Sequence, residues 1–214
     1  MLLQQYKIDK NRIWATGKSD GGGFVGVLAC DPILSARIAA FAPVSGAFYP
    51  GTAGTANCNA NLVNATCNPG RRPIPFIEFH GLLDDVIPYY GGKHAGECLP
   101  TVPHYLVQWA ERDSEGNTNQ TSELTNDTVV YTFPGGLVKG YLDASLFHEW
   151  PSTTPNPDNE LHHHVATYNA TTIILDFFSQ NPLNSSNASN ASNVSFPENY
   201  LTSRMFAPSK SSAA

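Results

Sequence analysis

The chain has 214 residues, of which 41% are hydrophobic and only 14% are charged. This length is enough to bury the core of one domain. A formal net charge of -6, with no stripe of basic residues, argues against a nucleic-acid partner. No apolar run approaches the length of a membrane span. The composition therefore argues against a nucleic-acid-binding protein, excludes an integral membrane protein and favours a globular domain.

The first half of the chain predicts two strands around a short helix. Residues 12–16 form a β-rich run that ends at a Gly-rich turn, and residues 24–29 read as a helix stopped by Asp31-Pro32. A second apolar run, residues 38–44, predicts a buried strand. A loop rich in Asn, Gly and Pro then covers about residues 51–72.

The second half continues the alternation of strands and helices. Residues 74–79 predict a third strand and residues 128–133 a fourth. Residues 103–112 read as a helix that begins with a proline, and residues 171–179 as an amphipathic helix. Nearly all-apolar strands that alternate with helices indicate an α/β fold, with a mostly parallel sheet and helices on both faces.

We expect residues 1–180 to form one domain and residues 181–214 an Asn- and Ser-rich low-complexity tail. The four cysteines, an even set, match no zinc or redox motif and predict two disulfides in a secreted protein, with three pairings open. The cysteines are Cys30, Cys58, Cys67 and Cys98.

Glycosylation sequons support export, because each of several asparagines is followed two positions later by Ser or Thr. They are Asn64, Asn119, Asn126, Asn169, Asn184, Asn187, Asn190 and Asn193. The residues after Met1 do not form a signal peptide. We therefore expect an N-terminal part to be missing from this sequence.

Residues 17–21, Gly-Lys-Ser-Asp-Gly, fit the G-x-S-x-G pattern between a predicted strand and a predicted helix. A nucleophilic serine needs a sharp turn that lifts its hydroxyl clear of the backbone, and small flanking residues permit such a turn. Ser19 is therefore the candidate nucleophile, and the Asp20 N–H, at the helix N-terminus, is a candidate oxyanion donor. The alternative is an ordinary Gly-rich loop.

A serine nucleophile needs a base held by an acid, in the chain order Ser, Asp, His. Asp84 and Asp85 compete for the acid, since both follow a buried strand, where α/β sheets place their sites; the alternative is that both cap the next turn. His148, in a loop after the last strand, is the candidate base. This chemistry needs no metal or cofactor.

The other histidines are weaker candidates. The run His162, His163 and His164 looks like a metal cluster, but a solvated polar run is the better interpretation, because adjacent residues point in different directions. We expect structural roles for the remaining three, His80, His94 and His104.

Three segments together resemble the feruloyl esterases and poly(3-hydroxybutyrate) depolymerase-like esterases of the α/β-hydrolase fold, close to the fungal feruloyl esterases. Residues 17–24 are similar to the nucleophile elbow of that family. Residues 80–89 are similar to its H-G-x-x-D-x-x-[VI]-P-Y acid loop, which selects Asp84 over Asp85. Residues 147–151 resemble its His-x-Trp-Pro loop, which selects His148.

The resemblance implies a secreted, monomeric serine esterase that releases ferulic acid from feruloylated plant cell-wall polysaccharide. Acetylxylan or polyester cleavage, or a non-catalytic carbohydrate-binding relative, are the alternatives. Tyr89, Tyr90 and Trp150 are candidates for stacking on a cinnamoyl ring or for the core.

Family members also have strands before the elbow and a His-Gly loop that supplies a second oxyanion donor. Nothing in this chain corresponds to them. We therefore expect an unpaired strand edge, an uncovered apolar face, and a chain that is poorly active or unfolded as written.

Overall fold

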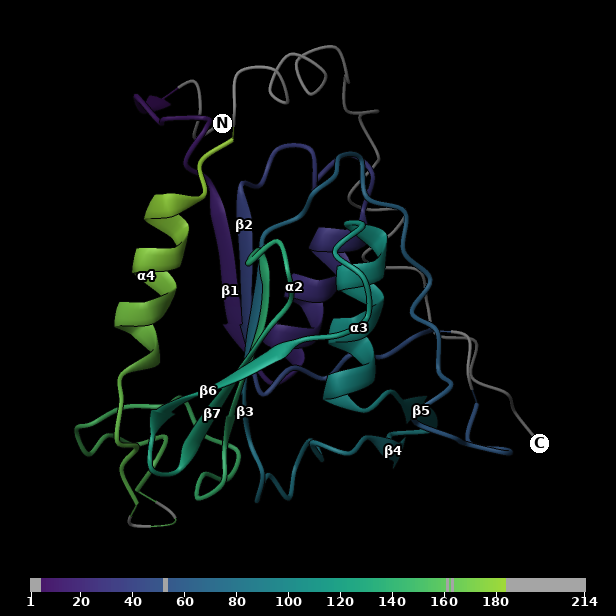
Figure 1. The fold of residues 1–214 in the computed structure, drawn as a ribbon, viewed down its shortest axis with the longest axis vertical. Coiled ribbons are helices and arrows are strands. Elements are labelled where there is room, and N and C mark those ends of the chain that lie inside the picture. The colour runs from purple at the N-terminus through teal and green to yellow at the C-terminus, as the bar shows by residue number, and fades with distance from the viewer. Residues whose placement is uncertain (1–4, 52–53, 161, 163, 184–214) are drawn as a thin grey trace.

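A six-stranded sheet forms the centre of the molecule (Figure 1). The computed structural model describes residues 5–51, 54–160, 162 and 164–183. In chain order the sheet strands are β1 (Trp14–Lys18), β2 (Ala40–Val44), β3 (Phe76–Gly81), β6 (Gln120–Thr125), β7 (Thr128–Thr132) and β8 (Val138–Asp143). Their spatial order is β1-β2-β3-β8-β7-β6. The first four of these are mutually parallel, whereas β7 and β6 are antiparallel additions.

Helices cover both faces of the sheet, as the sequence predicts. On one face lie α2 (Asp20–Cys30) and α3 (Val102–Arg112), and on the other lies α4 (Ala170–Gln180) (Figure 1). The alternation of side chains along each strand divides the core accordingly. Phe41 and Phe76 pack with α2 and α3, and Ile77 packs with α4. The molecule is therefore a three-layer α/β structure with a mostly parallel sheet.

Two of the six sheet strands, β6 and β8, are not predicted from the sequence. The strand predicted at residues 128–133 is observed as β7, but it runs antiparallel to its neighbour because a short turn through Gly135 and Gly136 connects it to β8. β8 contains Lys139 and Gly140, and β6 is exposed along most of its length, so neither has the apolar run that marks a buried strand. A separate small hairpin, β4 (Gly92–His94) with β5 (Glu97–Leu99), was also not predicted.

The predicted helices are present, and their side chains explain where they begin. Thr101 caps α3 by accepting a hydrogen bond from the His104 N–H at 3.1 Å. Asn169 caps α4 in the same way, accepting from the Thr171 N–H at 2.9 Å. α2 begins four residues earlier than predicted, directly after Ser19. The glycines that the sequence assigns to a turn form the first turn of the helix instead.

The expected strand edge is present in the described part of the chain. β1 lies at one end of the sheet order, with β2 as its only strand partner among the described residues. On α2, the side chains of Phe24 and Val27 are 43% and 56% exposed. None of the described helices is long and apolar enough to cross a membrane.

The predicted sequons differ in accessibility. Asn64, Asn119 and Asn126 are exposed. Asn169 is half-buried and its side chain already caps α4. The remaining sequons, like residues 184–214 of the predicted tail, lie outside the described residues.

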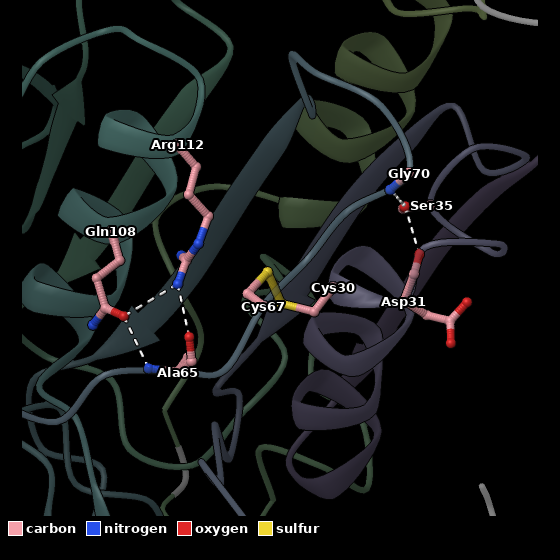
Figure 2. Close-up of a disulfide and its surroundings, with 8 residues drawn as sticks. All are labelled: Cys30, Asp31, Ser35, Ala65, Cys67, Gly70, Gln108 and Arg112. Atoms are coloured by element: carbon pink, nitrogen blue, oxygen red, sulfur yellow. Dashed lines mark hydrogen bonds between the residues drawn. A yellow bond between two sulfur atoms is a disulfide. The ribbon is translucent and has the colours of Figure 1, made fainter. Parts of the chain in front are cut away.

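The structure selects one of the three possible disulfide pairings. Cys30 pairs with Cys67 and Cys58 with Cys98, with Cα–Cα distances of 4.6 and 5.4 Å. The first bridge joins the end of α2 to the long loop between β2 and β3 (Figure 2).

Hydrogen bonds hold the same loop on both sides of this bridge. On one side the Ala65 N–H donates to the Gln108 side chain of α3 at 2.9 Å, and Arg112 donates to the Ala65 carbonyl at 2.8 Å. On the other side the Gly70 N–H donates to Ser35 Oγ at 2.8 Å (Figure 2). These bonds tie the loop to α3 and to the turn after α2, although the loop has almost no regular structure.

Replacing Cys30 and Cys67 together with alanine should lower the free energy of unfolding by about 2–4 kcal/mol, because the bridge closes a loop of 37 residues in the unfolded chain. Urea denaturation of the oxidised protein and of the double variant measures the difference. An unchanged midpoint at an equal slope would show that this bridge does not stabilise the fold.

Candidate active site

Ser19 occupies a strained turn between β1 and α2. Its backbone has φ 61° and ψ -127°, in the left-handed half of the Ramachandran plot that residues with a Cβ rarely adopt. The Ser19 N–H donates to the Val44 carbonyl at 3.0 Å, and its carbonyl accepts from Gly23 and Ala47 at 2.9 and 3.1 Å. The side chain does not cap the helix. The backbone is therefore fixed while the hydroxyl is left available.

Close backbone contacts explain the glycines around Ser19. A Cβ on Gly17 would lie 2.7 Å from the Gly21 carbonyl oxygen, and one on Gly23 would lie 2.0 Å from the Ala47 carbonyl oxygen. The turn therefore closes only with glycine at these positions. Asp20 is the first residue of α2, so its N–H is one of the helix-terminal donors without an intrahelical acceptor. This supports the predicted oxyanion donor by position.

Asp84 both caps a turn and holds His148. Its Oδ1 accepts from the N–H groups of Val86 and Ile87 at 3.0 and 2.7 Å, and its Oδ2 accepts from His148 Nδ1 at 2.8 Å. Asp84 is 6% exposed. Burial alone would raise its pKa, but hydrogen bonds from His148 and His80 outweigh that effect and hold the pKa well below its usual range. Asp84 is therefore an ionised acceptor at neutral pH.

The geometry separates the two competing acids. Asp85 is exposed, and its carboxylate makes no hydrogen bond or ion pair among the described residues. Of the two alternatives weighed from the sequence, capping and orienting the base, Asp84 does both, one with each oxygen.

The loops that carry Asp84 and His148 are joined directly. They follow β3 and β8, which are neighbours in the sheet. The Leu82 N–H donates to the Asp143 carbonyl at 2.7 Å, and the Leu83 N–H donates to the Leu146 carbonyl at 3.0 Å. A Cβ on Gly81 would lie 2.2 Å from the Leu146 carbonyl oxygen, so the two loops meet backbone to backbone. This contact fixes the imidazole against the carboxylate.

A second link joins the Ser19 turn to the His148 loop. Lys18, which directly precedes Ser19, donates from Nζ to the His148 carbonyl at 3.0 Å and forms an ion pair with Asp158. Asp158 in turn accepts from the Trp150 N–H at 2.6 Å. Burial would raise the pKa of Asp158, but the hydrogen bonds from Lys18 and Trp150 lower it overall. We call these contacts the Lys18–Asp158 clasp.

The three predicted triad residues therefore lie at the carboxyl ends of the parallel strands β1, β3 and β8, at one edge of the sheet. The structure brings Asp84 and His148 into hydrogen-bond contact. Among the described residues, Ser19 Oγ makes no hydrogen bond to His148. The bond between nucleophile and base is often loose in the absence of substrate.

The aromatic side chains singled out by the sequence have different surroundings. Tyr89 is 5% exposed and belongs to the core beside α3, so its ring offers almost no surface to a ligand. Trp150 is half-buried, packs against the core on the α4 side and donates from Nε1 to Thr171 Oγ1 at 3.0 Å. Tyr90, by contrast, is 66% exposed. The structure thus places Tyr89 in the core, one of the two alternatives left open for it.

His162 has a more specific place than a solvated polar run. Its ring stacks on Phe147 with centroids 4.0 Å apart, and its Nδ1 lies 3.0 Å from the buried carboxylate of Glu149. These two residues flank His148, so His162 packs under the loop of the candidate base. His163 lies outside the described residues, and no group of three or more potential metal ligands occurs within the described ranges.

Sequence reasoning did not single out Lys18, Asp158 or Glu78 as contributors to this region. Glu78 carried a usable signal, because a carboxylate inside an otherwise apolar strand must find a partner. Lys18 and Asp158 are 140 positions apart in the sequence. Considered separately, each residue looks like an ordinary charged residue on the surface. Only the fold shows that they meet.

Substitution of Asp158 with alanine should increase hydrogen exchange at the Trp150 amide about tenfold, because the loss of one charge-assisted hydrogen bond corresponds to ~1.4 kcal/mol. Glu160→Ala removes an exposed carboxylate from the same segment and serves as the matched control. Equal protection of the Trp150 amide in both variants would mean that the Lys18–Asp158 clasp does not hold the His148 loop.

The sequence matches no known protein-family model and no curated protein. The functional conclusion therefore depends on the side chains of this site.

Proposed function

We propose that the chain is a secreted serine carboxylic-ester hydrolase of the α/β-hydrolase type, with Ser19 as nucleophile, His148 as base and Asp84 as the acid that orients the base. The observation that carries the proposal is the Asp84–His148 hydrogen bond of 2.8 Å, at the same sheet edge as a serine in a strained turn. The paired cysteines and the exposed sequons support export.

The first step is acylation of Ser19. Because Asp84 accepts the proton on His148 Nδ1, Nε2 carries the lone pair that can remove the proton from Ser19 Oγ. The oxygen attacks the ester carbonyl, and the Asp20 N–H stabilises the developing oxyanion. The His148 imidazolium then gives its proton to the departing alcohol, which leaves the acyl group on Ser19.

The second step is hydrolysis of the acyl-enzyme. His148 removes a proton from water, the resulting hydroxide attacks the acyl carbonyl, and the carboxylic acid departs as Ser19 regains its proton. Asp84 stays ionised throughout and stabilises the imidazolium in both steps.

The substrate class we propose is a feruloyl ester of plant cell-wall polysaccharide. Leu83, Val86 and Tyr90 are 45%, 46% and 66% exposed, and all three lie on the loop that carries Asp84. Exposed apolar and aromatic side chains beside the triad suit a cinnamoyl ring. Tyr90, not the buried Tyr89, is the aromatic residue on this loop with a face available for stacking.

Asp84→Asn should lower kcat for an ester substrate by roughly 10⁴-fold. The asparagine would direct an N–H toward Nδ1 of His148 and so force the imidazole into the tautomer whose Nε2 carries a proton and cannot act as a base. Asp85→Asn, which changes the neighbouring exposed carboxylate, should retain full activity. Initial rates on methyl ferulate and on p-nitrophenyl acetate measure both effects.

Three outcomes would count against the proposal. Turnover that survives Ser19→Ala would remove the mechanism. Equal losses in the Asp84 and Asp85 variants would remove the orienting role. A folded protein that hydrolyses neither ester but binds xylan would favour the non-catalytic carbohydrate-binding alternative, whereas preference for acetylxylan or poly(3-hydroxybutyrate) over methyl ferulate would change only the substrate class.

A further inference from the structure

A buried pair of ionisable side chains lies directly behind the candidate acid. Glu78 and His80 project from β3 and are 0% and 1% exposed. His80 Nδ1 lies 2.7 Å from Glu78 Oε1. The other ring nitrogen, Nε2, lies 2.8 Å from the Ile87 carbonyl and 3.3 Å from Asp84 Oδ2. The proposed mechanism uses neither residue.

The partners of His80 restrict its protonation. Nε2 must carry a hydrogen, because the Ile87 carbonyl and the ionised Asp84 carboxylate can only accept. Nδ1 faces a carboxylate at hydrogen-bond distance, so one proton lies between Nδ1 and Glu78. If that proton is on the ring, His80 is an imidazolium and Glu78 its counter-ion.

We infer that His80 is a permanently protonated positioning residue for the proposed active site: its imidazolium, balanced by Glu78, fixes the charge and orientation of the Asp84 carboxylate that His148 needs. The inference rests on the proposed function for its catalytic consequence only. The protonation of His80 is a property of the fold, and it can be measured without any substrate.

Charge balance in the core favours the imidazolium. An isolated carboxylate at the position of Glu78 would be strongly disfavoured by desolvation, and an adjacent cation offsets that cost. No lysine or arginine within the described ranges forms an ion pair with Glu78. Burial alone would lower the pKa of His80, but the charge of Glu78 and the hydrogen bonds to Asp84 and Glu78 raise it to about 10.

The other titratable groups around the pair do not compete for its proton. Tyr89 from the loop after β3, Tyr105 from α3 and Tyr168 before α4 all interact with the charge of Glu78. Burial raises the pKa of each tyrosine, to about 12 for Tyr105, so all three are neutral. On its other side, His80 meets the Asp84–His148 pair.

The imidazolium has a defined effect on the base. It places a positive charge next to Asp84. This charge partly offsets the negative charge that Asp84 presents to His148. The positive charge therefore weakens the attraction between Asp84 and a protonated His148. Removal of the charge on His80 should therefore move the acid limb of the activity profile to higher pH.

The direct test is ¹⁵N NMR of the histidine rings in the unaltered protein, with His80 assigned through bonds to its backbone. At pH 7 both ring nitrogens of His80 should carry hydrogen, and they should remain protonated to at least pH 8. A ring nitrogen without hydrogen at pH 7 would overturn the inference, because the proton would then reside on Glu78. This result is independent of any esterase activity.

Glu78→Gln tests the effect on catalysis. The glutamine amide can donate to Nδ1, so His80 becomes neutral but keeps its Nε2–H bonds. The acid limb of kcat/KM should shift upward by roughly 0.5–1 pH unit, with KM at the pH optimum unchanged. Glu123 is an exposed residue of β6, so the control variant Glu123→Gln should leave the acid limb of kcat/KM unchanged.

If the acid limb of kcat/KM stayed at the same pH in a folded Glu78→Gln variant, the positioning role of His80 would be overturned. A merely structural role would lower stability without this shift. If the unaltered protein showed no ester turnover, the proposed function would fail, while the NMR result would still decide the protonation of His80.

Discussion

The site depends on one carboxylate with its hydrogen-bond acceptors fully used. Asp84 receives two backbone N–H groups on one oxygen, and His148 and His80 on the other. A carboxylate so surrounded cannot rotate without losing several charge-assisted bonds at once. Its position therefore fixes the ring of His148, and its ionisation fixes which nitrogen of that ring carries the proton. The role proposed for His148 follows from this arrangement.

Two linkages connect the loops that carry Ser19, Asp84 and His148. The Asp84 and His148 loops meet along neighbouring strands through direct backbone contact at Gly81. β1, which precedes Ser19, lies two strands from β3 and three strands from β8 in the sheet order, and the Lys18–Asp158 clasp links the Ser19 turn to the His148 loop. Backbone hydrogen bonds to Val44 at the end of β2 and to Ala47 just after it hold the strained Ser19 turn. Ser19 and His148 are thus held by different contacts, so the Asp84–His148 hydrogen bond forms although, among the described residues, Ser19 Oγ makes no hydrogen bond to His148.

Much of the fold could be read from the sequence because its central strands are nearly continuous apolar runs. β6 and β8 are not predicted from the sequence, because the side chains of β6 face solvent and the apolar residues of β8 are interrupted by Lys139 and Gly140. Ser19, Asp84 and His148 followed from local motifs. Lys18 and Asp158 could not be paired in advance, because their contact depends on how distant loops converge, and the sequence assigned His80 only a structural role. For Tyr89 the sequence leaves ligand stacking and core packing open, and its burial places it in the core.

The most direct test of the central claim is labelling with a fluorophosphonate, followed by peptide mass spectrometry on the folded protein. A serine activated by His148 should carry the label at Ser19, and the His148→Ala protein should lose it. Exposed serines such as Ser122 should remain unmodified in both. Failure of Ser19 to react in a protein whose folded state is verified, or equal labelling with and without His148, would contradict the assignment of a serine hydrolase.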